Sequence, residues 1–518
     1  MEAKVRPAQE EIKERAKSAK SSLKILEQDD SLTLRGIFSE PLSFSLREEK
    51  QAKDCMPRAL RSLSKIITGD LCHRCGSCVG ICPTGVLSVN EDDYPEVINL
   101  SACTDCNLCV QVCPGDEFNW QENYRKRYRR EIDLRNTHGF FKRGILGYAK
   151  DLSLREASTS GGLVTAILEY MLDRGEINGA LVTVSAKDPI WRGKPIIARS
   201  KEELRESVKS KYALTPTNIL LSEIAKNEGK FAVVGLPCQI HGIVKAMQIN
   251  PKLKEKIVLT IGLFCHAAIE HDAFKVLWET LGEVTKRAKR FISRVGKHPG
   301  TPHLELENGE LYPVYFPNKK GYRPSSMELI NIIYRLYTPP RCMTCFDALA
   351  EFADIAVGDP WMAPPKKDIN FYDGWSFALV RSSRGEEVVK RAEQSGYIHI
   401  EKVTKREALK CNTLMAHEKR WRAFRVIETN QRQGKPIPRY LPITQKFPRR
   451  LGFKFIKTEI HILTHIFCYL PRYRAAIFKF ILSDFGYYLL WLNKQRRKVR
   501  LFLRDKYERL RVALLGRE

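Results

Sequence analysis

Eight cysteines between residues 72 and 113 constrain this chain more than any other feature. They form two halves that both read C-x2-C-x2-C-x3-C-P, one ending at Cys82-Pro83 and the other at Cys113-Pro114. In this spacing three thiolates of one half bind one 4Fe-4S cubane, while the fourth reaches the other cluster. We therefore expect two clusters with crossed ligands. The first would be bound by Cys72, Cys75, Cys78 and Cys113, and the second by Cys103, Cys106, Cys109 and Cys82.

Zinc is the alternative metal for so many clustered thiols. Zinc sites usually separate two CxxC pairs by a longer spacer, and they need no proline after the last cysteine. The spacing therefore favours iron and sulfide. It predicts a ferredoxin-like module over residues 61–125 that carries single electrons.

The N-terminal sequence supports the metal interpretation. Residues 1–20 are charged from the second position and lack the apolar core of a secretory signal. We expect a cytoplasmic protein, in which clustered cysteines bind metals rather than form disulfides.

Short β-branched runs alternate with helical patterns between residues 146 and 420. The runs span 179–185, 230–235, 256–264 and 353–359. This alternation predicts an α/β core. Asn308-Gly309, within the alternating segment 303–316, predicts an antiparallel hairpin, so the sheet is expected to be mixed.

The end of the chain is strongly basic. Residues 420–518 hold 24 lysines and arginines against 6 acidic residues, a net charge of +18 out of +27 for the whole chain. Its apolar stretches fall short of the roughly 20 residues of a membrane span. We expect it to dock a protein partner or the anionic inner face of a membrane, or to be a plain solvated surface. No recognised nucleic-acid module is visible, which argues against nucleic acid as a partner.

Four further cysteines lie in the predicted core. Cys238 and Cys265 each follow a predicted strand, where α/β folds place binding sites, and Cys342 and Cys345 form a CMTC motif. These four are the candidate ligands of a third 4Fe-4S cluster. The alternative is that they are small buried apolar residues.

Three histidines flank these cysteine motifs. His73, His241 and His266 are each close in sequence to a motif cysteine and could tune a cluster or relay a proton. The plainer interpretation is a hydrogen-bonded loop histidine.

A Gly-Gly step, Gly161-Gly162, stands at the start of the segment 161–172, which is predicted to be a buried helix. The surrounding loop, 155–168, carries several hydroxyls and would offer free backbone N–H groups to an anion such as a phosphate. An ordinary helix cap is the alternative. Neither GxGxxG nor GxxxxGK[ST] occurs, which argues against a Rossmann or P-loop nucleotide site.

Several motifs in order carry a family resemblance. They are the ferredoxin cysteines, STSGG at 158–162, SKY at 210–212, GLPCQI at 235–240, GLFC at 262–265, CMTC at 342–345 and ADIAVGD at 353–359. Over residues 70–415 the chain resembles the beta subunits of coenzyme F420 hydrogenases and dehydrogenases. The similarity includes relatives with a fused N-terminal two-cluster ferredoxin domain.

The resemblance implies FAD in the α/β core and hydride exchange with the deazaflavin F420. Some branches instead reduce another substrate with electrons from ferredoxin. Carried over by motif, the flavin-binding residues would be Ser158, Thr159, Ser160, Gly161, Gly162, Thr165, Lys211, Gly235, Pro237 and Gln239. The resemblance assigns no catalytic residue here.

These patterns predict a multidomain protein of the α+β or α/β class. The expected parts are an N-terminal helical extension (1–60), a bacterial-type two-cluster ferredoxin domain (61–125), a mixed-sheet FAD-binding core (146–420) and a basic, amphipathic, helical C-terminal extension (421–518).

Three functions fit this organisation. The first is an F420-dependent oxidoreductase that passes single electrons through the clusters. The second is a ferredoxin-dependent reductase of an organic substrate, and the third is an electron-transfer subunit of a larger redox complex. All three imply a protein redox partner or a diffusible one.

Overall fold

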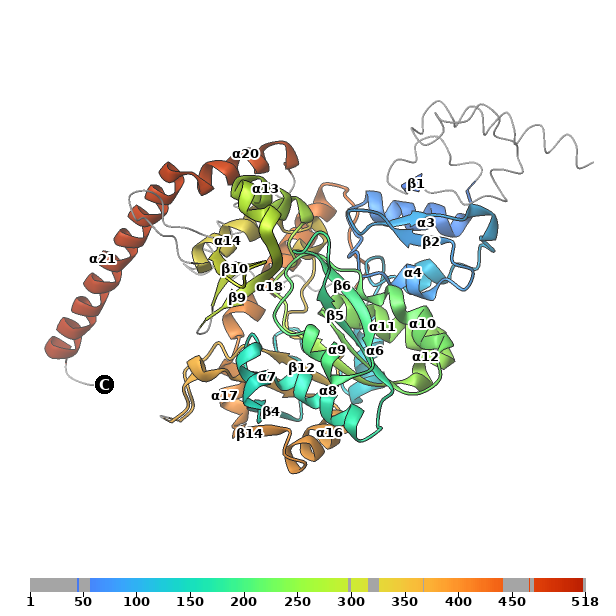
Figure 1. Ribbon diagram of the computed structural model, residues 1–518, viewed down its shortest axis with the longest axis horizontal. Helices are drawn as coiled ribbons and strands as arrows, with labels where there is room; N and C mark the ends of the chain where they lie inside the picture. Colours follow the sequence, from blue (N-terminus) through green and yellow to red (C-terminus); the bar gives the residue numbers. More distant parts are fainter. Residues whose placement is uncertain are drawn as a thin grey trace, which may run out of the picture.

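The centre of the molecule is an eight-stranded mixed β-sheet (Figure 1). In this computed structural model the described residues are 44–45, 56–296, 300–314, 326–366, 368–440, 465 and 470–515. The helical extension expected over residues 1–60 lies mostly outside them. In spatial order the strands are β14 (Ile398–Val403), β4 (Arg143–Ala149), β13 (Ser376–Val380), β12 (Ile355–Gly358), β8 (Ile257–Leu263), β7 (Phe231–Gly235), β5 (Gly179–Ser185) and β6 (Gly193–Ala198).

The middle strands β12, β8, β7 and β5 are parallel, and antiparallel pairs extend the sheet at both edges. These four strands coincide with the apolar runs from which the α/β core was predicted, so that prediction is confirmed. Nearly continuous apolar strands are typical of a sheet that is covered on both faces.

Helices do cover both faces of this sheet. Side chains alternate along β5: Leu181 belongs to one buried apolar cluster, and its neighbours Ala180 and Val182 belong to another. The helices on the Leu181 side are α10 (Leu221–Lys226), α11 (Pro237–Ile249) and α12 (Pro251–Lys256). Those on the other side are α8 (Leu163–Asp173), α9 (Lys201–Glu206) and α16 (Ser383–Gln394). The predicted buried helix at 161–172 is α8.

The cysteine-rich module lies beside α10 and α11 (Figure 1). Its elements are α3 (Arg58–Thr68), α4 (Ser77–Ile81), β2 (Leu87–Val89), β3 (Pro95–Val97) and α5 (Leu108–Gln111), and β1 (Phe44–Ser45) pairs with β3. The buried amide of Asn218 joins the module to the core, because its Nδ2 donates to Ser77 Oγ at 2.8 Å and to the Gln239 carbonyl at 2.9 Å. The module is therefore fixed against the core by buried contacts.

A small sheet and two helices pack beside the main sheet. The sheet contains β9 (Ala288–Val295), β10 (Thr301–Leu306) and β11 (Leu311–Pro313), and the helices are α13 (His271–Leu281) and α14 (Ser326–Tyr337). Strands β10 and β11 form the antiparallel hairpin predicted around Asn308-Gly309, but the hairpin belongs to this small sheet. The main sheet is mixed, as expected, because of other strands: β4, β6, β13 and β14.

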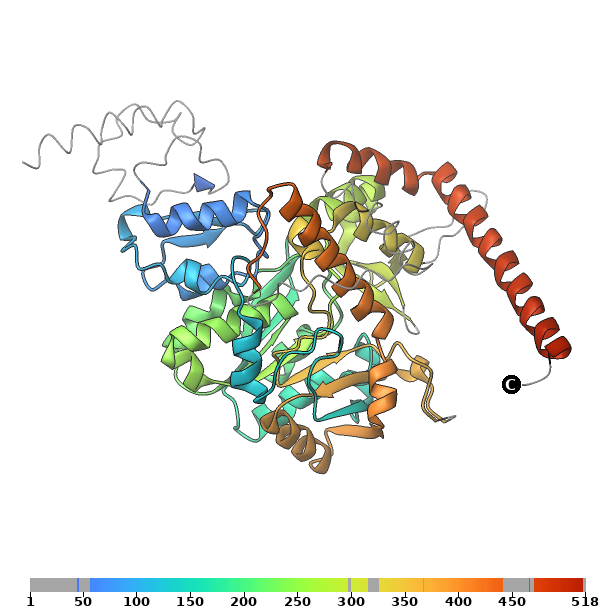
Figure 2. The ribbon, with the colours of Figure 1, turned by 180° about the vertical axis from the view of Figure 1, so that it is seen from behind.

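Helix α18 (Thr413–Arg432) crosses the domain boundary that was expected at residue 420. In Figure 2 it is the long orange helix that runs down the back of the molecule from the side of the cysteine module. It buries Lys419, Arg420 and Arg422, and farther on the N–H of Arg439 donates to the Asp116 carbonyl at 2.8 Å. The part of the basic extension that belongs to α18 is thus packed inside the molecule. Its buried basic residues lie in the same helix as buried apolar ones.

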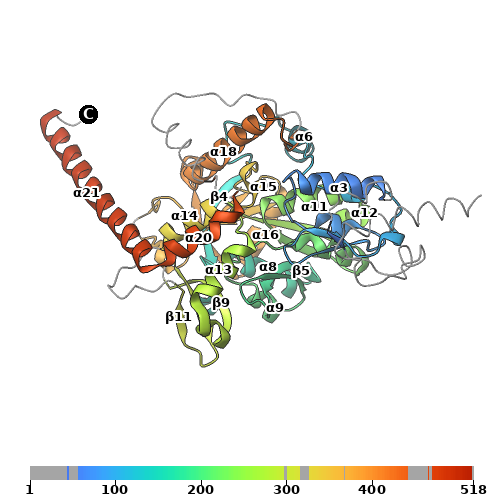
Figure 3. The same ribbon diagram turned by 90° about the horizontal axis from the view of Figure 1, so that it is seen from above.

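The chain continues into α20 (Pro471–Leu482) and α21 (Asp484–Leu515), and α21 extends away from the body (Figure 3). Of the helices in the described ranges, none is by itself long and apolar enough to cross a membrane. A pair bent by 75°, Arg472–Leu482 with Asp484–Arg496, passes that test only when its two arms are taken together. The apolar stretch at 460–469 lies almost wholly outside the described residues.

Candidate iron–sulfur and cofactor site

The cysteines expected around the second cluster line one small pocket of the module. Cys82, Cys103, Cys106 and Cys109 line it together with Ala59 and Leu60 of α3. Cys106 is exposed, whereas Cys109 is buried. Cys82 comes from the other half of the repeat, so the pocket has the crossed composition that the spacing predicts. This group therefore lies at the molecular surface.

The other four cysteines of the module gather deeper. The pKa of the Cys78 thiol is raised well above its ordinary value. Burial is the main cause, and the neighbouring thiols of Cys72, Cys113 and Cys75 add to it. The N–H of Arg74 donates to Cys72 Sγ at 3.3 Å. The members of this group are Cys72, Cys75, Cys78 and Cys113.

The topology of the parallel sheet assembles a third cysteine group. Cys238 is the second residue of α11, directly after β7, and Cys265 follows the adjacent parallel strand β8. Helix α15 (Pro340–Met343) carries Cys342, and Cys345 follows it. Burial raises the pKa of Cys238, and the thiols that add to the effect are Cys345, Cys75, Cys265 and Cys342. The structure thus brings the four predicted cysteines together, with Cys75 of the module next to them.

Among the described residues, no three His, Cys, Asp or Glu side chains are close enough to hold a single metal ion. A cubane makes a different demand, because each of its four thiolates binds a different iron atom. The cysteine sulfurs around a cluster are consequently spread more widely than those around one ion.

Buried cations surround the third cysteine group. Lys419 is only 2% exposed, and its Nζ donates to the Cys265 carbonyl at 2.8 Å. Burial disfavours its charge, but the thiolates of Cys265, Cys345 and Cys342 outweigh burial and raise the pKa of Lys419. Arg422 donates to the carbonyl of Cys342 at 3.4 Å. A buried cation needs a compensating anion, and a cluster with four thiolates carries negative charge.

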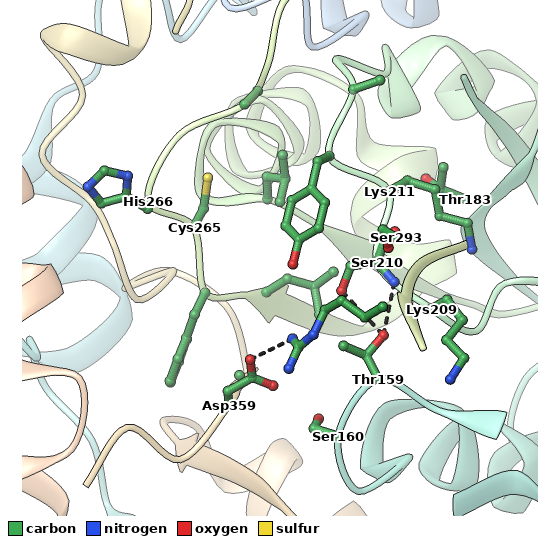
Figure 4. A pocket seen from close by; sticks show the side chains of 18 of the residues that line it. Thr159, Ser160, Thr183, Lys209, Ser210, Lys211, Cys265, His266, Ser293 and Asp359 are labelled. Carbon is green, nitrogen blue, oxygen red and sulfur yellow. Dashed lines mark hydrogen bonds and ion pairs between the residues drawn. The ribbon is translucent and has the colours of Figure 1, made fainter. Parts of the chain in front are cut away.

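A cavity of about 480 Å³ opens at the carboxyl ends of the parallel strands, the usual ligand position in α/β sheets. Figure 4 shows Cys265 and His266 at one side of this cavity and Lys209 and Lys211 at the other. Cys265 therefore belongs both to the third cysteine group and to the cavity wall. No other residue of the three cysteine groups is in the lining.

Most residues expected to bind the flavin line this cavity. They are Ser158, Thr159, Ser160, Gly162, Thr165, Lys211, Gly235 and Gln239. Gly161 and Pro237 are not in the lining. Gly161 lies behind it, because a Cβ there would be 2.5 Å from the Gly147 carbonyl. Gly162 caps α8 with a φ of 72°, a left-handed conformation that favours glycine.

Two of these residues have their polar atoms engaged within the protein. Gln239 Nε2 donates to the Thr215 carbonyl at 2.8 Å, and its Oε1 accepts from the Leu236 N–H at 2.7 Å. Gln239 thus shapes the turn before α11. Lys211 Nζ donates to the carbonyls of Ser207 and Val208 at the end of α9. Burial, and then the nearby Arg290, lower the pKa of Lys211 to about 7.

The cavity also contains residues that were not predicted. Lys209 Nζ donates to the Ser158 carbonyl at 3.1 Å, and Arg294 forms an ion pair with Asp359 at 2.7 Å. The half-exposed ring of Trp361 adds an aromatic surface. Asp359 directly follows β12 and could have been identified by its position after a strand. Arg294 and Trp361 gave no such signal.

The three flanking histidines have different environments. His241 Nε2 is 3.0 Å from Asp347 Oδ2, and its ring stacks on Phe118 with centroids 4.4 Å apart. His73 is buried, and burial followed by the charge of Arg341 lowers its pKa well below the ordinary value. His266 alone among the three lines the cavity. His241 is hydrogen-bonded, as the plainer interpretation expects, but it lies within helix α11 and not in a loop.

Cysteine groups that lead to a cavity at the carboxyl edge of a parallel sheet define an iron–sulfur redox protein of the α/β class. The coenzyme F420 hydrogenase/dehydrogenase beta-subunit family matches in two parts, its N-terminal domain at residues 145–222 and its C-terminal domain at 228–406. A 4Fe-4S dicluster domain matches residues 64–114. The chain belongs to this F420 beta-subunit family and carries a fused 4Fe-4S dicluster domain.

Two curated relatives and one solved structure are similar to parts of this chain. The coenzyme F420-dependent sulfite reductase of Methanocaldococcus jannaschii is 27% identical over 67% of this chain, and the match spans 50% of that relative. The coenzyme F420 hydrogenase subunit beta of Methanothermobacter thermautotrophicus is 24% identical over 58% of this chain and 99% of its own length. The F420-reducing [NiFe] hydrogenase complex of Methanosarcina barkeri contains a chain with a TM-score of 0.46 and 22% identity, covering 59% of this chain and 98% of its own.

Proposed function

We propose that this protein is an iron–sulfur flavoprotein oxidoreductase that exchanges hydride between coenzyme F420 and FAD. Single electrons would pass between the flavin and an acceptor through 4Fe-4S clusters. Membership of the F420 beta-subunit family and the dicluster domain support the F420 and iron–sulfur parts of this proposal. The cavity and its position support the flavin part.

The position of Cys265 carries the proposal. Cys265 lines the cavity and is also a near neighbour of Cys342 and Cys345. Cys75 lies next to Cys238, and the exposed Cys106 belongs to the outermost group. The three cysteine groups therefore follow one another from the cavity to the surface. Such an order suits electron transfer between a buried cofactor and an external partner.

The proposed ligand sets follow these groups. One cluster would be held by Cys82, Cys103, Cys106 and Cys109, a second by Cys72, Cys75, Cys78 and Cys113, and a third by Cys238, Cys265, Cys342 and Cys345. The buried Lys419 and Arg422 fit the third set, because their charges would balance those of a thiolate-bound cluster.

The cavity fits a phosphate-bearing flavin. The backbone N–H groups at the start of α8 and the hydroxyl of Thr159 would donate to the phosphates, with Lys209 and Lys211 nearby. Ser158 lines the cavity, but its hydroxyl donates to the Leu154 carbonyl at 2.7 Å. When bound, a flavin accepts two electrons as a hydride and releases them one at a time. The half-exposed Trp361 offers a flat apolar surface on which a second ring system could stack.

Anaerobic iron, sulfide and flavin analysis, followed by titration with reduced F420, tests this proposal. The proposal predicts twelve irons, twelve inorganic sulfides and one FAD per chain, as about four irons and four sulfides per cluster require. Reduced F420 should then bleach the flavin and cluster absorption bands. A holoprotein without flavin, or one that reduced F420 leaves unbleached, would contradict it.

The exposure of Cys106 favours a second candidate, in which electrons enter from ferredoxin and the flavin reduces an organic substrate. A protein donor needs a cluster near the surface, and the Cys106 group meets that need. Reduction of the flavin by reduced ferredoxin, together with no reduction by F420, would select this direction.

A further inference from the structure

Helices α20 and α21 form an elbow that is held to the body of the molecule through one face. The axes of the two arms differ by 75° across the break at Ser483. Phe478 is fully buried, and its ring lies 5.5 Å from that of Tyr337 in α14. Lys479 forms an ion pair with Glu279 of α13 at 2.8 Å, and Arg474 pairs with Asp272 of the same helix. The elbow therefore has a fixed place.

The outer face of α21 carries an apolar stripe. Its members are Phe485, Leu489, Leu492, Val499 and Leu503, which are between 40% and 58% exposed. Their spacings of three, four and seven residues place them on one side of the helix. Tyr487 is on the opposite side and is buried. The stripe thus faces away from the protein.

Aromatic rings are concentrated at the bend itself. The rings of Phe480 and Phe485 lie 5.9 Å apart across the bend, and those of Tyr488 and Trp491 stack at 6.0 Å. Tyr473 and Phe480 of α20 are also about half exposed. Tyrosine and tryptophan are enriched where a membrane meets water, because each ring has an apolar body and a polar group.

Positive charge accompanies the apolar stripe. Residues 470–515 contain twelve lysines and arginines against three acidic residues, a net charge of +9. Apolar side chains on one face together with excess lysine and arginine are typical of helices that lie in the plane of a bilayer interface. Anionic headgroups attract such segments.

We propose that the elbow of α20 and α21 binds the surface of an anionic lipid bilayer, with the apolar stripe and Phe480 entering the interface. A second copy of the chain fits this surface less well. The exposed Arg496 falls in the register of the stripe, between Leu492 and Val499, so pairing two stripes would oppose like charges. An anionic lipid surface instead matches both the charge and the apolar side chains.

This inference goes beyond the proposed redox function and does not depend on it. Helix α20 packs on α13 and α14, and both of those helices contribute residues to the cavity wall, including Phe274 and Tyr334. Binding at the elbow would therefore hold the cavity in a constant orientation to the membrane.

Vesicle flotation of the full-length, anaerobically purified protein tests the proposal. The probes are vesicles of phosphatidylcholine alone and vesicles in which about a third of the lipid is phosphatidylglycerol. The protein should float with the anionic vesicles and much less with the neutral ones, and high salt should weaken its binding. Replacing the stripe, as Phe485→Ser/Leu489→Ser/Leu492→Ser, should weaken binding to anionic vesicles by more than about tenfold.

A control variant changes three exposed leucines elsewhere, Leu152→Ser/Leu311→Ser/Leu414→Ser, and should bind like the wild type. Failure of the wild type to float with anionic vesicles would overturn the proposal. Flotation that survives in the stripe variant would also overturn it. A stripe-dependent dimer in sedimentation, without any vesicle binding, would assign the surface to a second copy instead.

Discussion

Lys419 is the buried residue most directly placed to act on the proposed third cluster. Its ammonium group lies among three cysteine thiols of the third group and is nearly inaccessible to water. Reduction adds negative charge to a cluster, and a nearby buried cation favours that charge. Lys419 should therefore raise the reduction potential of a cluster at this position.

We expect Lys419→Met to lower the reduction potential of the third cluster by tens of millivolts, on the order of a lost buried charge interaction. An anaerobic redox titration monitored by electron paramagnetic resonance measures this shift. The exposed Lys390, replaced as Lys390→Met, is the control and should leave the potential unchanged. An unaltered potential in a Lys419→Met protein that retains its clusters would contradict this role.

Lys211 should give the proposed flavin binding a pH dependence. Burial lowers its pKa to about 7, so it is protonated below that pH and neutral above it. Because flavin phosphates are anionic, they bind the protonated form more tightly. FAD affinity should be steady below pH 7 and fall by up to about tenfold per pH unit above it. Fluorescence titration of the flavin-free protein between pH 6 and 9 measures this, and Lys211→Met should flatten the curve. A flat wild-type curve would exclude the role.

The sequence allowed some of these residues to be predicted and not others. The module cysteines were predictable because their spacing is local and specific to cubane binding. Lys419 and Arg422 were not, because a basic run in sequence does not reveal whether its side chains are buried. Arg294 was missed for a similar reason: its role depends on Asp359, which is 65 residues away.

Among the elements, α4 and α11 determine how the module meets the core. A Cβ at Gly80 would lie 2.0 Å from the Asn218 carbonyl, and one at Gly242 would lie 2.1 Å from Ser77 Oγ. The neighbouring atom of Gly80 belongs to the backbone and cannot easily move. Glycine is therefore required where the two parts touch.

We expect Gly80→Ala to lower the free energy of unfolding by about 1–3 kcal/mol, the usual cost of an added methyl group in a packed contact. Thermal denaturation of the anaerobic protein, followed by circular dichroism, measures the loss. Lys65→Ala changes an exposed residue of the same module and should have little effect. Equal melting temperatures for the two variants would contradict the tight contact between Gly80 and the Asn218 carbonyl.

Elements with local signals were predicted well. The four parallel strands and the Asn308-Gly309 hairpin follow from short apolar runs and turn residues. Strands β4, β13 and β14 were not predicted, since they pair residues more than 200 positions apart. Helix α18 continues without a break through residue 420, where the sequence placed a domain boundary.

At the scale of the whole molecule, three cysteine groups connect the surface to the cavity. The outermost contains the exposed Cys106, the middle one contains Cys75, and the innermost shares Cys265 with the cavity wall. Sequence motifs predicted the members of each group. Their order could not be predicted, because it depends on how the module docks on the sheet.

The most direct test of this order is rapid anaerobic mixing of the holoprotein with reduced F420. Flavin absorbance and cluster paramagnetic resonance are followed in the wild type, in Cys265→Ala and in Cys411→Ala, which changes a buried cysteine outside the three groups. We predict that the flavin is reduced in all three proteins, and that the module clusters are reduced at the wild-type rate only when Cys265 is present. Reduction of the module clusters at the wild-type rate in Cys265→Ala would contradict the proposed path.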